Sequence, residues 1–104
     1  MQLHLIPHLN NIFRATMWGD GKVIISEGIK QLGKDFELAA LRSVRFASTN
    51  NEWADEGDFV VKGCRIIWRI LYMNRTLDDA SPDPSDPNVT LRVLHLTLPR
   101  ETLL

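Results

Sequence analysis

The stretch Ser81-Pro-Asp-Pro-Ser-Asp-Pro-Asn-Val-Thr-Leu-Arg-Val-Leu-His-Leu-Thr-Leu98 decides how this chain folds. Its prolines fix φ and remove backbone donors, so residues 81–87 can form neither a helix nor an interior strand. The segment Val89–Leu98 is rich in β-branched and apolar residues, which predicts a strand. Because both faces of this strand carry apolar residues, we expect it to be central in a sheet that the rest of the chain covers.

Apolar residues at helical spacing predict a helix over Leu5–Met17. Asn10, Asn11 and Arg14 are expected to face water from this helix. Glycine and aspartate then predict a turn at residues 18–21, and a short strand follows the turn.

Two further helices are predicted after this strand, which spans Lys22–Ser26. Ser26 is a suitable N-cap for a helix over Glu27–Leu32, with Gly33 as its stop. Asp35 is expected to cap the next helix, which extends through Ala47 and presents mostly small residues on one face. Small residues allow close approach to a sheet, so we expect this helix to lie nearest the core.

A β-hairpin is predicted after a polar, turn-forming segment. Its strands are Phe59–Lys62 and Cys64–Met73, and the Lys62-Gly63 step has the composition of a tight hairpin turn. Alternation along the second strand places Arg65 and Arg69 on a mixed, exposed face. The opposite, core-facing side is predicted to consist of Cys64, Ile66, Trp68, Ile70 and Tyr72.

Together these elements predict a single α+β domain over residues 1–104. We expect a roughly four-stranded, mainly antiparallel sheet with two to three helices packed on it. No internal repeat or linker interrupts the pattern.

The composition is that of an ordinary globular protein, with 44% hydrophobic and 24% charged residues. The net charge of −1 lacks the strongly basic balance of a dedicated nucleic-acid-binding domain. Cys64 is the only cysteine, so no intramolecular disulfide can form, and we expect it to be a small buried hydrophobic residue. The chain has no signal-peptide pattern and no apolar run of membrane-spanning length, so we expect a cytoplasmic protein.

Acidic residues cluster in two predicted loops. One loop carries Asp55, Glu56 and Asp58, and the proline segment carries Asp83 and Asp86. Carboxylates can bind divalent cations, but this spacing fits no EF-hand, and Asp or Ser beside proline commonly bonds its own backbone. We therefore predict no metal and no other cofactor, and we interpret both loops as candidate partner-binding surfaces.

The sequence contains no recognisable catalytic constellation. His4 and His8 are four residues apart, but a third zinc ligand at suitable spacing is missing. His95 lies in a predicted strand without a local nucleophile, and no glycine-flanked serine or glycine-rich cofactor motif is present. We therefore expect a protein that is not an enzyme.

Arg92 lies on a strand face otherwise lined by leucines, where burying an unpaired guanidinium would be costly. An aspartate on a rigid loop can accept the planar donors of arginine. We predict that Arg92 pairs with Asp83 or Asp86 and so clamps the acidic loop onto the strand. In the alternative, the guanidinium of Arg92 extends into water.

Five motifs occur in order along the chain: Leu9-Asn-Asn-Ile-Phe-Arg14, Gly21-Lys-Val-Ile-Ile-Ser-Glu-Gly28, Glu56-Gly-Asp-Phe59, Trp68-Arg-Ile-Leu-Tyr72 and the run from Ser81 to Leu94. Together they resemble, over nearly the whole chain, a family of small bacterial proteins called domain of unknown function 3768. The resemblance implies a bacterial protein whose gene lies on a plasmid, phage or other mobile DNA. It implies no activity.

Two of these motifs depart from the family pattern. Gly57 stands where the family usually has the histidine of Glu-His-Asp-Phe-Gly, and Leu71 stands where it usually has the aspartate of Trp-Lys-Ile-Asp-Tyr. The resemblance therefore implies that any histidine–aspartate site of the family has been lost from this chain.

Our leading hypothesis is a small non-catalytic interaction protein that acts on a host protein complex, for example as a defence-system inhibitor such as an anti-CRISPR protein. A proline-stiffened loop loses little entropy on binding, which suits recognition. One alternative is a nucleic-acid-binding accessory factor of a mobile element that uses Arg65, Arg69 and Arg75. A second alternative is a degenerate metal-dependent hydrolase.

Overall fold

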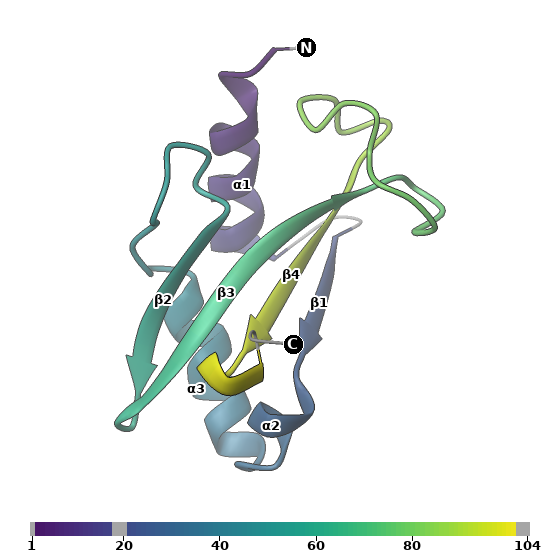
Figure 1. Cartoon of the computed structure of the whole chain (residues 1–104). Helices are drawn as coiled ribbons and strands as arrows, with labels where there is room; N and C mark the ends of the chain where they lie inside the picture. Colours follow the sequence, from purple (N-terminus) through teal and green to yellow (C-terminus); the bar gives the residue numbers. More distant parts are fainter. Residues whose placement is uncertain (1, 18–20, 102–104) are drawn as a thin grey trace.

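The computed structural model describes residues 2–17 and 21–101, so the predicted turn at residues 18–21 lies largely outside the described residues. The elements follow one another along the chain as labelled in Figure 1: α1 (Leu5–Thr16), β1 (Lys22–Ile25), α2 (Glu27–Lys30), α3 (Lys34–Val44), β2 (Glu56–Val61), β3 (Cys64–Met73), β4 (Leu91–Thr97) and a short 3-10 helix, η1 (Pro99–Glu101). This arrangement confirms the predicted α+β class.

The four strands form one sheet in the order β1-β4-β3-β2. β3 pairs antiparallel with both β2 and β4, whereas β1 pairs parallel with β4. The sheet is therefore mixed but mainly antiparallel, as predicted. β4 is an inner strand, and all of its residues except His95 are buried.

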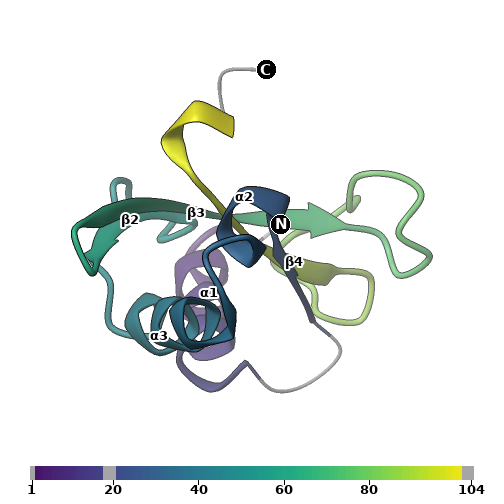
Figure 2. The ribbon, with the colours of Figure 1, turned by 90° about the horizontal axis from the view of Figure 1, so that it is seen from below.

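The helices cover one face of the sheet. Figure 2 shows α1 and α3 on one side and η1 on the other. We call the first side the covered face and the second the open face. The core lies between the covered face and the helices, and its fully buried members include Ile29, Val44, Ile66, Trp68, Ile70, Leu94 and Leu96.

The hairpin between β2 and β3 has the predicted turn. Lys62 and Gly63 both adopt positive φ, 50° and 79°, as a two-residue type I′ turn requires. β3 spans the predicted residues, Cys64–Met73. Cys64 itself is half-buried rather than fully buried, because it lies at the end of the strand next to the turn.

Several boundaries differ from the prediction. β2 begins at Glu56 rather than Phe59. The charged residues at its start do not prevent strand formation, because in this edge strand they lie on the open face. β4 begins at Leu91 rather than Val89, because the Thr90 hydroxyl donates to Asp83 O (2.7 Å) and so keeps the strand's first predicted residues in the loop.

The ends of α2 and α3 also differ from the prediction. Ser26 caps α2 as predicted, accepting from Ile29 N at 3.3 Å, but α2 ends at Lys30. Gly33, with a φ of 103°, precedes α3 and takes the N-cap position assigned to Asp35. None of the helices in the described ranges is both long and apolar enough to cross a membrane.

Candidate functional site

Two acidic residues that were predicted to lie in the first loop, Glu56 and Asp58, lie in the sheet instead. Glu56 and Asp58 lie on β2 and face arginines of β3. Asp58 Oδ2 accepts from Arg65 Nη2 (2.6 Å) and Nε (2.9 Å), and the Glu56 carboxylate lies 3.5 Å from Arg69 Nε. The two acids and two arginines therefore form a ladder of exposed ion pairs on the open face.

Asp55 is separated from this ladder. Its Oδ2 accepts from the Tyr72 hydroxyl at 2.7 Å, and its Oδ1 accepts from Asn51 Nδ2 at 2.7 Å. The carboxylate is thus engaged in holding the loop before β2 against β3, rather than being presented to a partner.

The two aspartates of the proline loop bond to the loop itself. Asp83 Oδ1 accepts from the Ser85 hydroxyl (2.6 Å) and backbone nitrogen (3.0 Å), and these bonds lower the pKa of the Asp83 carboxyl. Asp86 Oδ1 accepts from Asn88 N at 2.9 Å. This is the turn chemistry expected of aspartate beside proline. The structure does not gather the five predicted acidic residues into one surface.

The predicted clamp at Arg92 exists, but the predicted partner is wrong. Arg92 Nη2 donates to the backbone oxygen of Pro84 at 2.7 Å, and Nε donates to Asn10 Oδ1 at 2.7 Å. No carboxylate of the described residues lies within salt-bridge distance of Arg92. Asp83 and Asp86 are occupied by their own turns, so the loop presents a carbonyl oxygen to Arg92 instead.

Asn10 and Arg14 are buried, contrary to the prediction that they face water. Asn10 Nδ2 donates to the Tyr72 hydroxyl (2.7 Å) and to Trp53 O (2.9 Å). Arg14 donates to the backbone oxygen of Ala47 and lies over the Trp68 ring, 4.7 Å from its centroid. The helical spacing of residues 6, 10, 13, 14 and 17 was the available signal, because it places both polar residues within the apolar stripe of α1.

Asn10, Tyr72 and Arg92 form the centre of a polar network that sequence reasoning missed. It joins α1, β3 and β4 to the loops on either side, through Asp55 at one end and Pro84 O at the other. Burial and the hydrogen bond to Asp55 raise the pKa of Tyr72 well above its ordinary value. Burial lowers the pKa of Arg92.

The three arginines proposed for nucleic-acid binding lie in different places and have different partners. Arg65 and Arg69 are exposed on the open face and are paired with carboxylates. Arg75 follows β3 in a loop, where its Nη1 donates to Pro87 O at 3.1 Å. The alternation of residues in the sequence identified the exposed face of β3, but it did not identify the carboxylates that pair with the arginines on this face.

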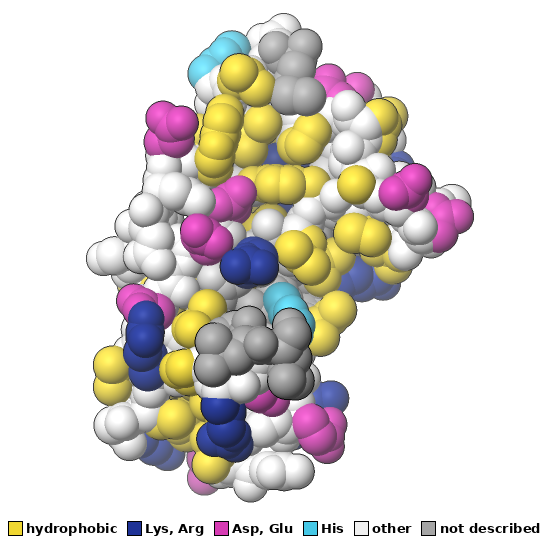
Figure 3. Space-filling view, viewed as in Figure 1, with side chains coloured by type: hydrophobic (Ala, Val, Ile, Leu, Met, Phe, Trp, Pro, Cys, Tyr) yellow, Lys and Arg dark blue, Asp and Glu magenta, His cyan; other side chains and the backbone are white. Residues whose placement is uncertain are grey.

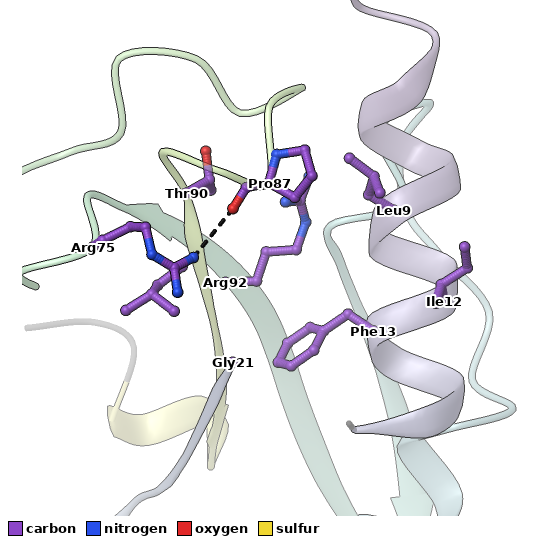
Figure 4. A pocket seen from close by; sticks show the side chains of 9 residues that line it. Leu9, Ile12, Phe13, Gly21, Arg75, Pro87, Thr90 and Arg92 are labelled. Atoms are coloured by element: carbon purple, nitrogen blue, oxygen red, sulfur yellow. Dashed lines mark hydrogen bonds between the residues drawn. The ribbon is translucent and has the colours of Figure 1, made fainter. Parts of the chain in front are cut away.

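A cavity of about 270 Å³ lies between α1 and the start of β4, and Figure 4 shows its lining. Arg75 lines it from the loop after β3 and Arg92 from β4, while Leu9 and Phe13 contribute apolar surface from α1. The cavity forms where β4 has no β1 neighbour, since β1 pairs with β4 only from Val93 onward.

Histidines and the cysteine do not converge in the structure. His4 and His8 are exposed near the start of α1, and His95 is half-buried opposite Arg69 on the open face. Within residues 2–17 and 21–101, no three side chains of the types His, Cys, Asp and Glu gather to hold a metal ion.

The two positions that depart from the family motifs lie on opposite faces of the sheet. Gly57 pairs with the buried Trp68, and a Cβ there would lie 2.4 Å from Ser48 O. Leu71 alternates with the buried Ile70 and is exposed on the other face. A histidine and an aspartate at these two positions would lie on opposite faces of the sheet and would not form one site in this fold.

A search of curated proteins and a search of solved structures each found no match to the chain. The sequence profile of one family, described as a protein of unknown function (DUF3768), matches residues 25–101. The match includes α2, α3, three of the four strands (β2, β3 and β4) and the proline loop, but not α1 or most of β1, so it is narrower than the resemblance first suggested. Because it covers most of the 104 residues, the chain belongs to the DUF3768 family.

Proposed function

We propose that this protein is a small non-catalytic interaction protein that binds a partner protein through the open face of its sheet. The observation that carries the proposal is the unequal covering of the sheet. Helices α1 and α3 bury one face, whereas the open face has only η1 on it among the described elements.

The open face combines exposed apolar side chains with fixed charges. Ile24, Val60 and Leu71 are 49%, 66% and 38% exposed, and the Glu56–Arg69 and Asp58–Arg65 pairs lie among them. Figure 3 shows hydrophobic, acidic and basic side chains next to one another over the middle of this face. Exposed apolar surface bordered by polar groups is typical of protein-binding sites.

The ion pairs favour a protein over a nucleic acid as the partner. Each exposed arginine of β3 already has a carboxylate within 3.5 Å, so the face carries little net positive charge. Phosphate binding requires cations that can replace condensed counterions. We further propose that the partner is part of a host complex such as a defence system, which the resemblance to a mobile-element family supports.

The test is affinity capture from the host lysate with two matched variants. Leu71→Asp places a charge on the open face, and Leu38→Asp places one on α3 at similar exposure, 38% against 43%. We expect a stoichiometric partner whose capture falls roughly tenfold or more with Leu71→Asp and is unchanged with Leu38→Asp.

Three results would contradict the proposal: no stoichiometric partner, equal effects of the two variants, or a gel shift with DNA or RNA at micromolar protein and low salt. The last result would instead support the nucleic-acid alternative. Both variants should be folded by circular dichroism before capture is compared, since an unfolded variant also loses its partner.

A further inference from the structure

One edge of the sheet is formed by β2, and in the described part of the chain no strand pairs with its outer side. The tight turn after β2 makes Val61 and Cys64 a hydrogen-bonded pair. Every second residue of β2, beginning with Val61, therefore bonds to β3, and the residues between them direct their backbone N–H and C=O groups outward. The bond from Asn50 N to Glu56 O (2.8 Å), which lies on the outer side of β2, agrees with this alternation.

Asp58 and Val60 have free backbone groups at this edge. Their N–H and C=O groups point outward, and neither backbone bonds to a described residue on that side. Such a row of unpaired groups is a template for another strand. Asn50 closes the row at one end and the turn at Lys62 closes it at the other, so only the short segment from Asp58 to Val60 can pair.

The two most exposed of the large hydrophobic side chains in the described residues lie near the same edge. Phe46 is 87% exposed and Val60 is 66% exposed. Val60 projects onto the open face, and Phe46 lies two residues before Ser48, whose carbonyl oxygen adjoins Gly57 of β2. Figure 1 shows the segment after α3 beside the outer side of β2. Apolar groups of this kind next to unpaired backbone groups indicate an edge that a further chain covers.

We propose that β2 pairs with β2 of a second copy of this chain, antiparallel and around a twofold axis at Phe59, so that the two sheets become one continuous sheet. In this register Asp58 faces Val60 of the second copy. Each of these two residues donates its N–H to the C=O of the other, and the twofold axis repeats both bonds. The half-buried Phe59 faces Phe59 of the second copy, where cross-strand aromatic contact is favourable.

Charge complementarity favours a second copy as the occupant of this edge. When Asp58 faces Val60 of the second copy, Lys62 lies opposite Glu56 of the second copy, and the axis repeats this contact between opposite charges. Lys62 has no ion-pair partner among the described residues, and the Glu56 side chain is 41% exposed. A register in which Asp58 faces Asp58 of the second copy would set two like charges directly opposite each other, which is unfavourable.

The pairing also accounts for the exposed Phe46. Figure 2 shows α3 on the covered face near β2, and a twofold axis perpendicular to the sheet keeps the helices of both copies on the same side. The segments that follow α3 in the two copies therefore come together where the sheets join. This self-association goes beyond the proposed function and does not depend on it.

Sedimentation equilibrium of the full chain tests for the dimer. Because so few residues pair, we expect a weak, reversible monomer–dimer equilibrium with a Kd between about 1 µM and 1 mM. No larger assembly should form through this contact, because a twofold contact is closed.

Val60→Pro tests the backbone pairing. Proline removes the outward N–H of this residue but no bond to β3, and an edge strand tolerates it at such a position. We expect dimerisation to weaken by about tenfold or more, because the twofold axis repeats the lost bond. The matched control is Val60→Ile, which keeps the N–H and the β-branched side chain and should dimerise as the wild type does.

Lys62→Glu and Glu56→Lys test the register without altering the backbone. Each variant alone sets like charges opposite each other at both symmetric contacts and should weaken dimerisation roughly tenfold. A 1:1 mixture of the two variants should dimerise about as tightly as the wild type, because the mixed dimer has opposite charges at both contacts.

The proposal is overturned if the wild type remains monomeric up to about 1 mM. It is also overturned if Val60→Pro folds, as judged by circular dichroism, and dimerises as tightly as Val60→Ile. Failure of the mixture of Lys62→Glu and Glu56→Lys to recover dimerisation would overturn it as well, and this result decides the matter if Val60→Pro does not fold.

Discussion

Four arginines illustrate the difference between the two faces of the sheet. On the covered face, Arg14 and Arg92 are buried and bond to neutral oxygens, and each lies over an aromatic ring. On the open face, Arg65 and Arg69 are exposed and bond to carboxylates.

The buried arginines hold chain segments together, whereas the exposed arginines hold only side chains. Arg92 joins α1 to the proline loop, and Arg14 joins α1 to the segment after α3. Losing a buried partner leaves polar atoms without water, which costs more than losing an exposed ion pair. We therefore expect the covered face to determine stability, even though two salt bridges lie on the open face.

The largest effect is expected for Arg92→Met. This change keeps the apolar stem but leaves Asn10 Oδ1 and Pro84 O without their donor, and Asn10 is fully buried. We expect a loss of about 3 kcal/mol in the free energy of unfolding, measured with urea.

The matched control for this change is Arg42→Met on the exposed side of α3, which should alter the free energy of unfolding by less than about 0.5 kcal/mol. If both variants unfold at the same urea concentration, the network at Arg92 has no special role in stability.

Tyr72→Phe should have the next largest effect. Removing the hydroxyl takes one acceptor from Asn10 and one donor from Asp55, although both retain other partners. We expect a loss of about 1–2 kcal/mol in urea unfolding. A variant as stable as the wild type would show that water replaces the hydroxyl in this network.

The ionisation of Tyr72 should also make the stability of the covered face depend on pH. The folded state raises its pKa, so above the ordinary value of 10.0 the unfolded chain releases a proton that the folded chain keeps. Stability should therefore fall as the pH rises above about 10, and Tyr72→Phe should remove this part of the loss.

Tyr72 is the only tyrosine in the chain, so the ultraviolet absorbance of tyrosinate reports this group alone. We expect the folded protein to titrate at a higher pH than the protein in urea. Titration of both at the same pH would mean that the hydroxyl is not buried in the network.

The smallest effect is expected on the open face. A double-mutant cycle with Arg65→Ala and Asp58→Ala should give a coupling energy below about 1 kcal/mol, because both side chains are partly exposed to water. The coupling should shrink further as salt is added. A coupling as large as the loss in Arg92→Met would reverse the ranking of the two faces.

Local patterns predicted the elements whose conformation depends on neighbouring residues. β3 and the Lys62-Gly63 turn were located correctly, because alternation and the need for positive φ are both local properties. Helix α1 was located almost as well, but the burial of Asn10 and Arg14 was not predicted, because polarity was given more weight than the spacing of the two residues.

The candidate sites were harder to predict. The acidic residues were identified as a group, but whether each carboxylate meets an arginine, a hydroxyl or a backbone amide depends on how the loops fold back. The pairing of Glu56 and Asp58 with arginines depends on the register of β2 against β3, and this register is set only when the hairpin forms. The cavity arises from the short length of β1, which no single motif reveals.

The sequence by itself determined the α+β class, the hairpin and an inner last strand preceded by a loop that cannot join the sheet. Proline geometry and the alternation of apolar residues act over a few residues, so they can be inferred from the chain alone. Only the tertiary structure decided that β1 lies parallel to β4 and that Arg92 meets Asn10, which is 82 residues away in sequence. Contacts at such separation depend on how the helices pack on the sheet, and a buried guanidinium donates to whichever oxygen that packing brings within reach.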